Sequence, residues 1–460
     1  MLLVWTAVIV AAPQLEAQVK LLAVGELDQS RAGNFADLSG LTYTLENGVP
    51  ANLLGGLGSG IAYASGNTFL ALPDRGPNAV PFDSAIDDTV SYIDRFHTVN
   101  MDLTPNTSGS GLPFTLTPRL SSTTLLWSFL TPLVYGNGVG LGVGPGDPKL
   151  NNFLQHYFTG RSDNFDSRQN SGDTNDARLD PESIRLSNDG LSVFISDEYG
   201  PYVYQFDRLT GVRIRTFQLP PSFFVSTLSP VGNDEITLNK SGRVANKGME
   251  GLAITPDGRT LVGIMQNALI QDAGAAPNLL RIVAIDIASG RTTRQFAYLL
   301  TTGSGVSDIV ALNNHEFLVD ERDGHGRGDG SKAKIKQLFK IDLAGAADVS
   351  AMDGAGAASH AVNKTLFLDI VDLLKENGFA ADQIPAKIEG TAFGPDINAG
   401  GTRLHTLWVA NDNDFLTTVA DDNGNNVPNP NQFFVFGFAD TDLEGSTFLP
   451  QQFHEFLPFF

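Results

Sequence analysis

Residues 179–201 read LDPESIRLSNDGLSVFISDEYGP. Apolar and polar residues alternate before the Asn188–Gly190 segment, and a short apolar run follows it, so two strands are predicted. Asn-Asp-Gly is typical of a hairpin turn, because Asn and Gly tolerate the positive φ that such turns need. A hairpin brings the chain back to its start. We therefore expect Glu182, before the first strand, and Asp197 with Glu198, after the second, to lie at the same end.

The same pattern recurs in four more places along the chain. The further copies occupy residues 59–78, 249–267, 307–323 and 388–414. Four of the five copies carry an acid at the entrance of the first strand, and all five carry acids or amides after the second. Two copies continue into a third and a fourth strand. Four-stranded units repeated around a ring form a β-propeller, which leaves no long free sheet edge.

The fold class predicted is therefore an all-β propeller of four-stranded blades, with loop insertions and one short helix. Five copies and one degenerate copy give six blades, and seven is the nearest alternative. The degenerate copy would lie in the long insertion 121–178, which does not fit the repeat. The helix is predicted over 366–379 from its apolar spacing. The strand 19–27 is expected to pair with the last repeat and close the ring.

Residues 19–460 are predicted to form a single domain preceded by a signal peptide over 1–17. The apolar run 2–12 has signal-peptide length and is followed by small residues; a buried N-terminal strand is the alternative. The run is too short to span a membrane, and no other stretch qualifies. We therefore expect a secreted or periplasmic protein without a transmembrane segment.

The composition restricts the partners and the chemistry. The formal net charge of −21 argues against nucleic acid, whose phosphates need a basic face, and favours cations. The chain contains no cysteine, which excludes disulfides, thiolate metal sites and a cysteine nucleophile. The sequence also lacks a His-x-x-x-His zinc pattern and a Gly-x-Ser-x-Gly elbow.

A site is predicted where the first strands enter the central channel, because the first strand of each blade lines it. Carboxylate and amide oxygens that gather there would suit a hard cation, Ca²⁺ first. The predicted metal ligands are Glu182, Asp197, Glu250, Asp308, Glu389, Asn411 and Asp412. In the alternative interpretation these side chains cap strand ends and tie neighbouring blades together through backbone amides.

Several of these segments resemble the phytase-like domain family, which is named for an esterase-like activity of phytase. The resemblance rests on Asp180–Glu182, Asp197–Pro201, Asn246–Gly258, Glu321–Asp323 and Asn411–Phe415, and in motif order it covers about residues 38–440. It implies an exported β-propeller, a hydrolase acting on phosphate or other esters, and calcium dependence by analogy with propeller phytases.

The function expected is that of a secreted, metal-dependent hydrolase of a small-molecule phosphoric or carboxylic ester. Glu198 or Glu250 would act as general base, and Arg75 and Arg322 would stabilise developing negative charge. Sparse local lysine and arginine favour an ester less charged than phytate. The alternative is a non-catalytic propeller that binds a ligand or partner and holds a structural calcium ion.

Overall fold

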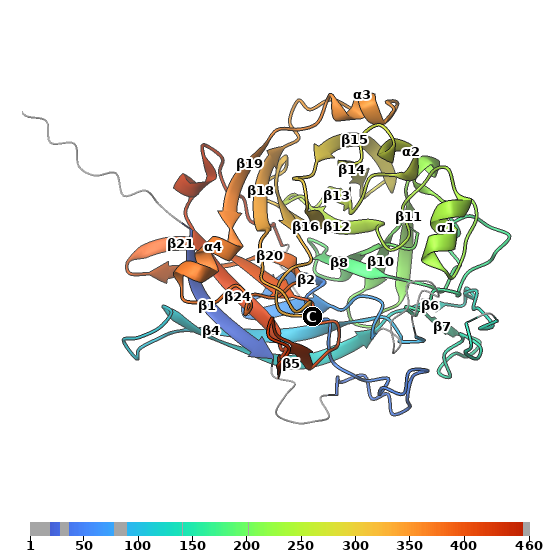
Figure 1. The fold of residues 1–460 in the computed structure, drawn as a ribbon, viewed down its shortest axis with the longest axis horizontal. Helices are drawn as coiled ribbons and strands as arrows, with labels where there is room; N and C mark the ends of the chain where they lie inside the picture. Colours follow the sequence, from blue (N-terminus) through green and yellow to red (C-terminus); the bar gives the residue numbers. More distant parts are fainter. Residues whose placement is uncertain (1–18, 28–35, 78–89, 140, 201, 454–460) are drawn as a thin grey trace, which may run out of the picture.

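Five four-stranded sheets stand in a ring in the computed structural model, which describes residues 19–27, 36–77, 90–139, 141–200 and 202–453 (Figure 1). Each sheet is one blade. The innermost strands, numbered as the first to the fifth blade along the chain, are β2 (Gly60–Ser65), β8 (Pro181–Leu186), β12 (Met249–Ile254), β16 (Gly305–Ala311) and β20 (Ile388–Ala399). Each inner strand contacts the inner strands of both neighbouring blades, and β20 contacts β2, so the ring is closed. The space that these strands enclose is called the channel below.

Three further strands complete each blade. The second strands are β3 (Thr68–Leu72), β9 (Ser192–Asp197), β13 (Thr260–Met265), β17 (Glu316–Arg322) and β21 (Thr402–Asn411). The third strands are β4 (Arg95–Pro105), β10 (Tyr202–Asp207), β14 (Leu279–Asp286), β18 (Lys336–Asp342) and β24 (Asn431–Phe438). The outer strands are β5 (Phe114–Leu125), β11 (Arg213–Gln218), β15 (Arg291–Leu299), β19 (Lys364–Asp369) and β1 (Lys20–Leu27).

The N-terminal strand closes the ring, as predicted. β1 pairs antiparallel with β24 and becomes the outer strand of the fifth blade, although the two strands stand at opposite ends of the sequence. The last blade thus combines both ends of the described chain. Its backbone hydrogen bonds replace a covalent closure and leave no unpaired edge between the first and the last blade.

The expectation of six blades, with seven as the alternative, is wrong, because the described residues form five. The insertion 121–178 does not fold into a blade. β5 extends into its first residues, and β6 (Trp127–Phe129) and β7 (Gln155–Tyr157) then form a two-stranded ribbon, joined to the second blade by one bridge between Trp127 and Val212. The segment after β6 is rich in glycine and polar residues, so it cannot supply the two apolar faces that a blade between two neighbours must bury.

The helix expected over 366–379 is too long at both ends. Its first residues belong to the outer strand β19, and α4 covers only Ile370–Glu376, where Ile370, Leu373 and Leu374 are buried. The expectation of a single short helix is also wrong, because the described residues form further helical segments. The other helical segments are η1 (Pro221–Phe223), α1 (Gly232–Leu238), α2 (Ile270–Ala273), α3 (Gly354–Ala358) and η2 (Asp440–Leu443). A further two-stranded ribbon is formed by β22 (Thr418–Ala420) and β23 (Asn426–Pro428).

The core lies between the blades. Because successive side chains of a strand point to opposite faces, each blade buries apolar residues against both neighbours. Ile184 and Ile195 of the second blade pack with Leu70 of the first, whereas Phe194 packs with Leu252 of the third. Similar clusters fill the remaining three junctions. This arrangement explains the short apolar runs, since a strand buried on both faces does not need to alternate.

The middle of the channel is closed by an ion pair between Arg185 of β8 and Asp308 of β16. Both side chains are buried, and Arg185 Nη2 lies 2.8 Å from each carboxylate oxygen of Asp308. Arg185 also donates to the Ile61 carbonyl of the first blade at 2.8 Å. The backbone N–H and hydroxyl of Thr391, in the fifth blade, both donate to Asp308 at 2.9 Å. One buried pair therefore ties four blades together.

Replacing Asp308 by Asn tests this pair. The substitution removes the charge that compensates buried Arg185, and breaking such a pair costs about 3–5 kcal/mol. We expect urea denaturation to show a loss of this size, with Asp147→Asn, at an exposed position, as the matched control. An Asp308→Asn protein as stable as the control would contradict the conclusion that this ion pair ties the blades together.

Candidate active site

Four of the five inner strands have a β-bulge at their entrance. The pairing with the second strand shifts register in β8, β12, β16 and β20, at the first two or three residues of the strand. Glu182, Glu250 and Glu389 stand in these bulges, and Ser307 takes the corresponding place in β16. Because a bulge re-aims side chains, the three glutamates gather at one mouth of the channel.

Three carboxylates come together at this mouth in the second blade. One oxygen from each of Asp180, Glu182 and Glu198 lies within 4.8 Å of the others. Asp180 precedes β8 and Glu198 follows β9, so the hairpin brings them together as its turn predicts. Burial and the negative charges of Glu250 and Asp180 raise the pKa of Glu182 well above its usual range. The cluster is therefore under strong electrostatic repulsion when all its members are ionised.

Glu250 of the third blade adjoins this cluster. Its side chain is 2% exposed, and its Oε2 has no hydrogen-bond partner among the described residues. Burial and the charges of Glu198 and Glu389 raise the pKa of Glu250 well above its usual range. Burial, with the charge of Asp180, raises the pKa of Glu198 to about 7.

Arginine side chains face the acids from two sides. Arg75 Nη1 lies 2.8 Å from Asp180 Oδ2 and also contacts the Asn246 side chain. Arg322 forms an ion pair with Glu389, and its Nε donates to Ser307 Oγ at 2.8 Å. Each guanidinium is thus held in a fixed orientation beside the carboxylates.

The mouth continues through the fifth blade to the first. Lys387 Nζ lies 2.7 Å from Asp412 Oδ2 and also pairs with Asp414. Burial is the main cause that raises the pKa of Asp412 to about 7, although Lys387 acts against it. Asp74 is partly exposed, and its Oδ1 accepts the Gly76 N–H at 3.0 Å. Burial and the charge of Asp412 raise the pKa of Asp74 well above its usual range.

Three predicted ligands lie behind the mouth, where their side chains accept hydrogen bonds from backbone N–H groups or from Arg185. Asp197 accepts the backbone N–H of Asp180 at 3.0 Å and two further N–H groups after β9. Asp308 lies deeper in the channel with Arg185. Asn411 Oδ1 accepts the Gln432 N–H at 2.5 Å. For these side chains the contacts match the alternative interpretation, in which polar groups tie strand ends together.

Residues that the sequence predictions did not assign to the site are Asp180, Asn246, Gly248 and Lys387. Asp180 was present in the Asp-Pro-Glu motif, two residues before Glu182, and Lys387 stands two residues before Glu389. In a strand, residues two apart point to the same face, so the spacing from each glutamate could have indicated both side chains. Gly248 could not be found in this way, because it acts through its backbone N–H, which donates to Glu198 Oε1 at 2.6 Å.

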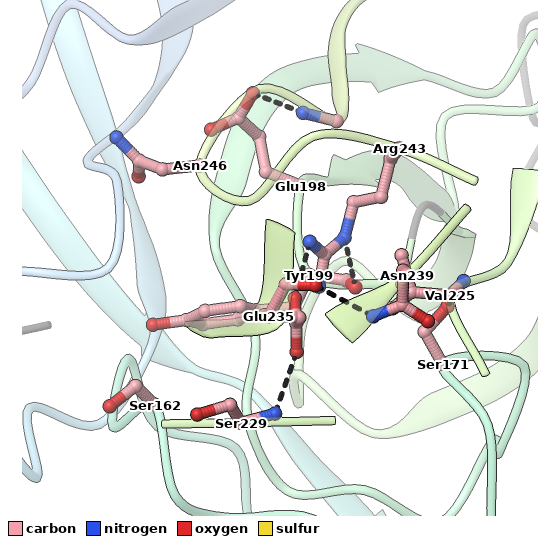
Figure 2. Close-up of polar contacts among 12 residues, drawn as sticks. Ser162, Ser171, Glu198, Tyr199, Val225, Ser229, Glu235, Asn239, Arg243 and Asn246 are labelled. Carbon is pink, nitrogen blue, oxygen red and sulfur yellow. Dashed lines mark hydrogen bonds and ion pairs between the residues drawn. The ribbon is translucent and has the colours of Figure 1, made fainter. Parts of the chain in front are cut away.

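The loop between the second and third blades, residues 219–248, supports the mouth from one side (Figure 2). Arg243 Nη1 lies 2.6 Å from Glu235 Oε1, and both side chains are buried. Arg243 Nε donates to the Tyr199 carbonyl at 2.6 Å, next to Glu198. The ion pair thus fixes the loop that carries Asn246 and Gly248 to the acids.

The fold and the mouth define a class: a five-bladed β-propeller with a carboxylate cluster at one end of its channel. The chain belongs to the phytase-like family, described as "Esterase-like activity of phytase", whose family model matches residues 52–415. This membership confirms the resemblance that the sequence motifs indicated.

The chain is similar to one curated protein in sequence and, more weakly, to several proteins of known structure. A protein of Arthroderma benhamiae described as an uncharacterized secreted protein is 26% identical over 300 residues. The match covers 52% of this chain and 58% of that protein, so the chain spans little more than half of the relative's length. Kuenenia stuttgartiensis hydrazine synthase has 12% identity, 78% coverage of both chains and a TM-score of 0.32. Kluyveromyces lactis Hsv2 has 9% identity, 66% and 58% coverage, and a TM-score of 0.25.

The predicted signal peptide, residues 1–17, lies outside the described residues. Within the described part of the chain, every helix is too short or too polar to cross a membrane.

The raised pKa values predict how stability depends on pH. A glutamate whose pKa rises from 4.5 to about 7 on folding, as for Glu198, keeps a proton that the unfolded chain has lost. The free energy of unfolding should therefore fall as pH rises from about 5 to 8 in EDTA. Calorimetry should show a lower melting temperature at pH 8, and added Ca²⁺ should raise it more at pH 8 than at pH 5. A melting temperature in EDTA that rises from pH 5 to pH 8 would contradict the raised pKa of the mouth carboxylates.

Proposed function

We propose that this protein is a secreted hydrolase of ester bonds whose active site is the carboxylate cluster at the channel mouth, working with a bound Ca²⁺ ion. The observation that carries the proposal is the close approach of three carboxylate oxygens, from Asp180, Glu182 and Glu198. Beside them lies the buried Oε2 of Glu250, which has no hydrogen-bond partner in the part of the chain that the structure describes. Membership in a family described by an esterase-like activity, and a relative described as secreted, support it.

A hard divalent cation fits the chemistry of these residues. Their donors are all carboxylate oxygens, which Ca²⁺ prefers, and burial together with repulsion among the acids raises the pKa of Glu182. Asp180, Glu182 and Glu198 would hold the ion. When bound, it would polarise the ester and lower the pKa of a coordinated water molecule.

Glu250 is the general base of the proposal. Its buried carboxylate accepts a proton from the attacking water, whose oxygen bonds to the carbonyl carbon or phosphorus of the ester. The bond to the leaving alcohol then breaks, and Glu250 returns the proton to the departing oxygen. The raised pKa of Glu250 makes it a better base for this step than an exposed glutamate.

Arg75 and Arg322 stabilise the negative charge that develops on the ester oxygen. Each guanidinium is already oriented, Arg75 by Asp180 and Arg322 by Glu389, so little reorganisation is needed during the reaction. The same ion pairs neutralise much of their charge. The proposed substrate is therefore a small ester with little charge, because a polyphosphorylated one would need free cations as well.

The alternative is a binding propeller in which the mouth holds a structural ion. The observation that favours it is the pairing of Arg75 with Asp180 and of Arg322 with Glu389, because each pair joins two neighbouring blades. Lys387 pairs with Asp412 within the fifth blade. Only the hydrolase should turn over an ester, so hydrolysis assays of the parent protein and of two variants distinguish the two functions.

Glu250→Gln should reduce hydrolysis of p-nitrophenyl acetate or p-nitrophenyl phosphate at least about 100-fold, because the amide cannot accept the water proton. Circular dichroism and the melting temperature should stay close to those of the parent. Glu376→Gln, at an exposed position in α4, is the matched control. Retained turnover in Glu250→Gln would overturn the catalytic assignment. Calcium binding without hydrolysis in the parent protein would establish the binding propeller instead.

A further inference from the structure

The end of the channel opposite the carboxylates is covered by the C-terminal segment Phe448–Phe453. Leu449 N donates to the Leu312 carbonyl at 2.8 Å, and Gln452 N donates to the Pro256 carbonyl at 3.0 Å. Gln451 Nε2 donates to the Leu186 carbonyl at 2.7 Å. These carbonyls stand at or just beyond the ends of three inner strands, whereas the carboxylates stand at the beginnings. The segment is therefore a cover over the far mouth.

A cavity of about 100 Å³ lies between this cover and the inner strands. All five inner strands or the residues just after them contribute to its wall, together with the C-terminal segment. The wall is mainly apolar and includes Ile254, Val310, Ala392, Phe393 and Phe448. A cavity of this size and lining takes small apolar molecules in other proteins.

One charged side chain, that of Arg185, also lines the cavity. It is 4% exposed, and its terminal nitrogens are engaged by Asp308 and by the carbonyls of Ile61, Ile184 and Ile309. Its Nε has no hydrogen-bond partner among the described residues. A buried N–H donor without a partner costs free energy. Because Nε is itself fully buried, a ligand oxygen reaches it from the cavity after a small shift of the neighbouring side chains, and would then recover this free energy.

We propose that this cavity is a second binding site, separate from the carboxylate mouth, for a small neutral apolar molecule with one acceptor oxygen, such as a short-chain ketone or ester. The apolar part packs against the wall, and the oxygen accepts from Arg185 Nε. The ligand is neutral because Asp308 already balances the charge of Arg185. A carboxylate would add a buried charge without a counter-charge.

Calorimetric titration of the full chain with pentan-2-one tests the proposal. We expect saturable binding of pentan-2-one, weaker binding of 1-chlorobutane, which lacks the carbonyl, and none of butanoate. Glu250→Gln should bind pentan-2-one as the parent does, because the two sites lie at opposite ends of the channel. Absence of saturable binding, or binding lost in Glu250→Gln, would overturn the proposal.

Two variants test whether pentan-2-one binds in this cavity. Ala392→Leu fills the cavity and should weaken pentan-2-one binding at least about tenfold, whereas Ala420→Leu, at an exposed position in β22, should leave it unchanged. Phe453→Ala opens the cover at its edge, where Phe453 packs against Tyr63 of the first blade, and should also weaken binding. Parent-like affinity in both Phe453→Ala and a folded Ala392→Leu would overturn the assignment.

Discussion

The ring depends on the ion pair between Arg185 and Asp308. A buried pair gains little net stability over apolar packing, but once built it cannot lose one partner without leaving a charge in the interior. Its contacts reach the first, second, fourth and fifth blades. Ser183 Oγ lies 3.0 Å from Asp308 Oδ1 and 3.3 Å from the Leu252 carbonyl oxygen of the third blade. The pair therefore specifies which strands meet at the axis.

The inner strands also approach closely at small residues. A side chain at Gly251 would come within 2.9 Å of the Asp308 backbone, and one at Gly390 would come within 2.9 Å of the Gly58 carbonyl. The glycine that follows the glutamate in two bulges is thus required by the narrow centre of a five-bladed ring. In β16 the corresponding residue is Asp308 itself, whose carboxylate takes the space at the axis and binds Arg185.

This central layer divides the channel into two chambers of opposite character. At the entrance, bulges direct glutamates into a polar mouth where arginines are already oriented by acids. Beyond Arg185, the walls are apolar and the C-terminal segment covers the exit. The two ends therefore present different chemistry, carboxylates and guanidinium groups at one and apolar walls at the other. The loop held by Glu235 and Arg243 adds the backbone donor that the bare ring lacks at Glu198.

The sequence by itself determined the hairpins, the all-β propeller and the common end at which Glu182, Glu198, Glu250 and Glu389 meet, because turn chemistry and strand alternation are local properties. Three features were decided only by the tertiary structure. The number of blades follows from how closely inner strands pack. The register follows from hydrogen bonds between strands, which place Ser307 rather than Asp308 beside the glutamates. The ion-pair partner of Asp180, Arg75, comes from the first blade, and no local pattern encodes contacts made across a ring.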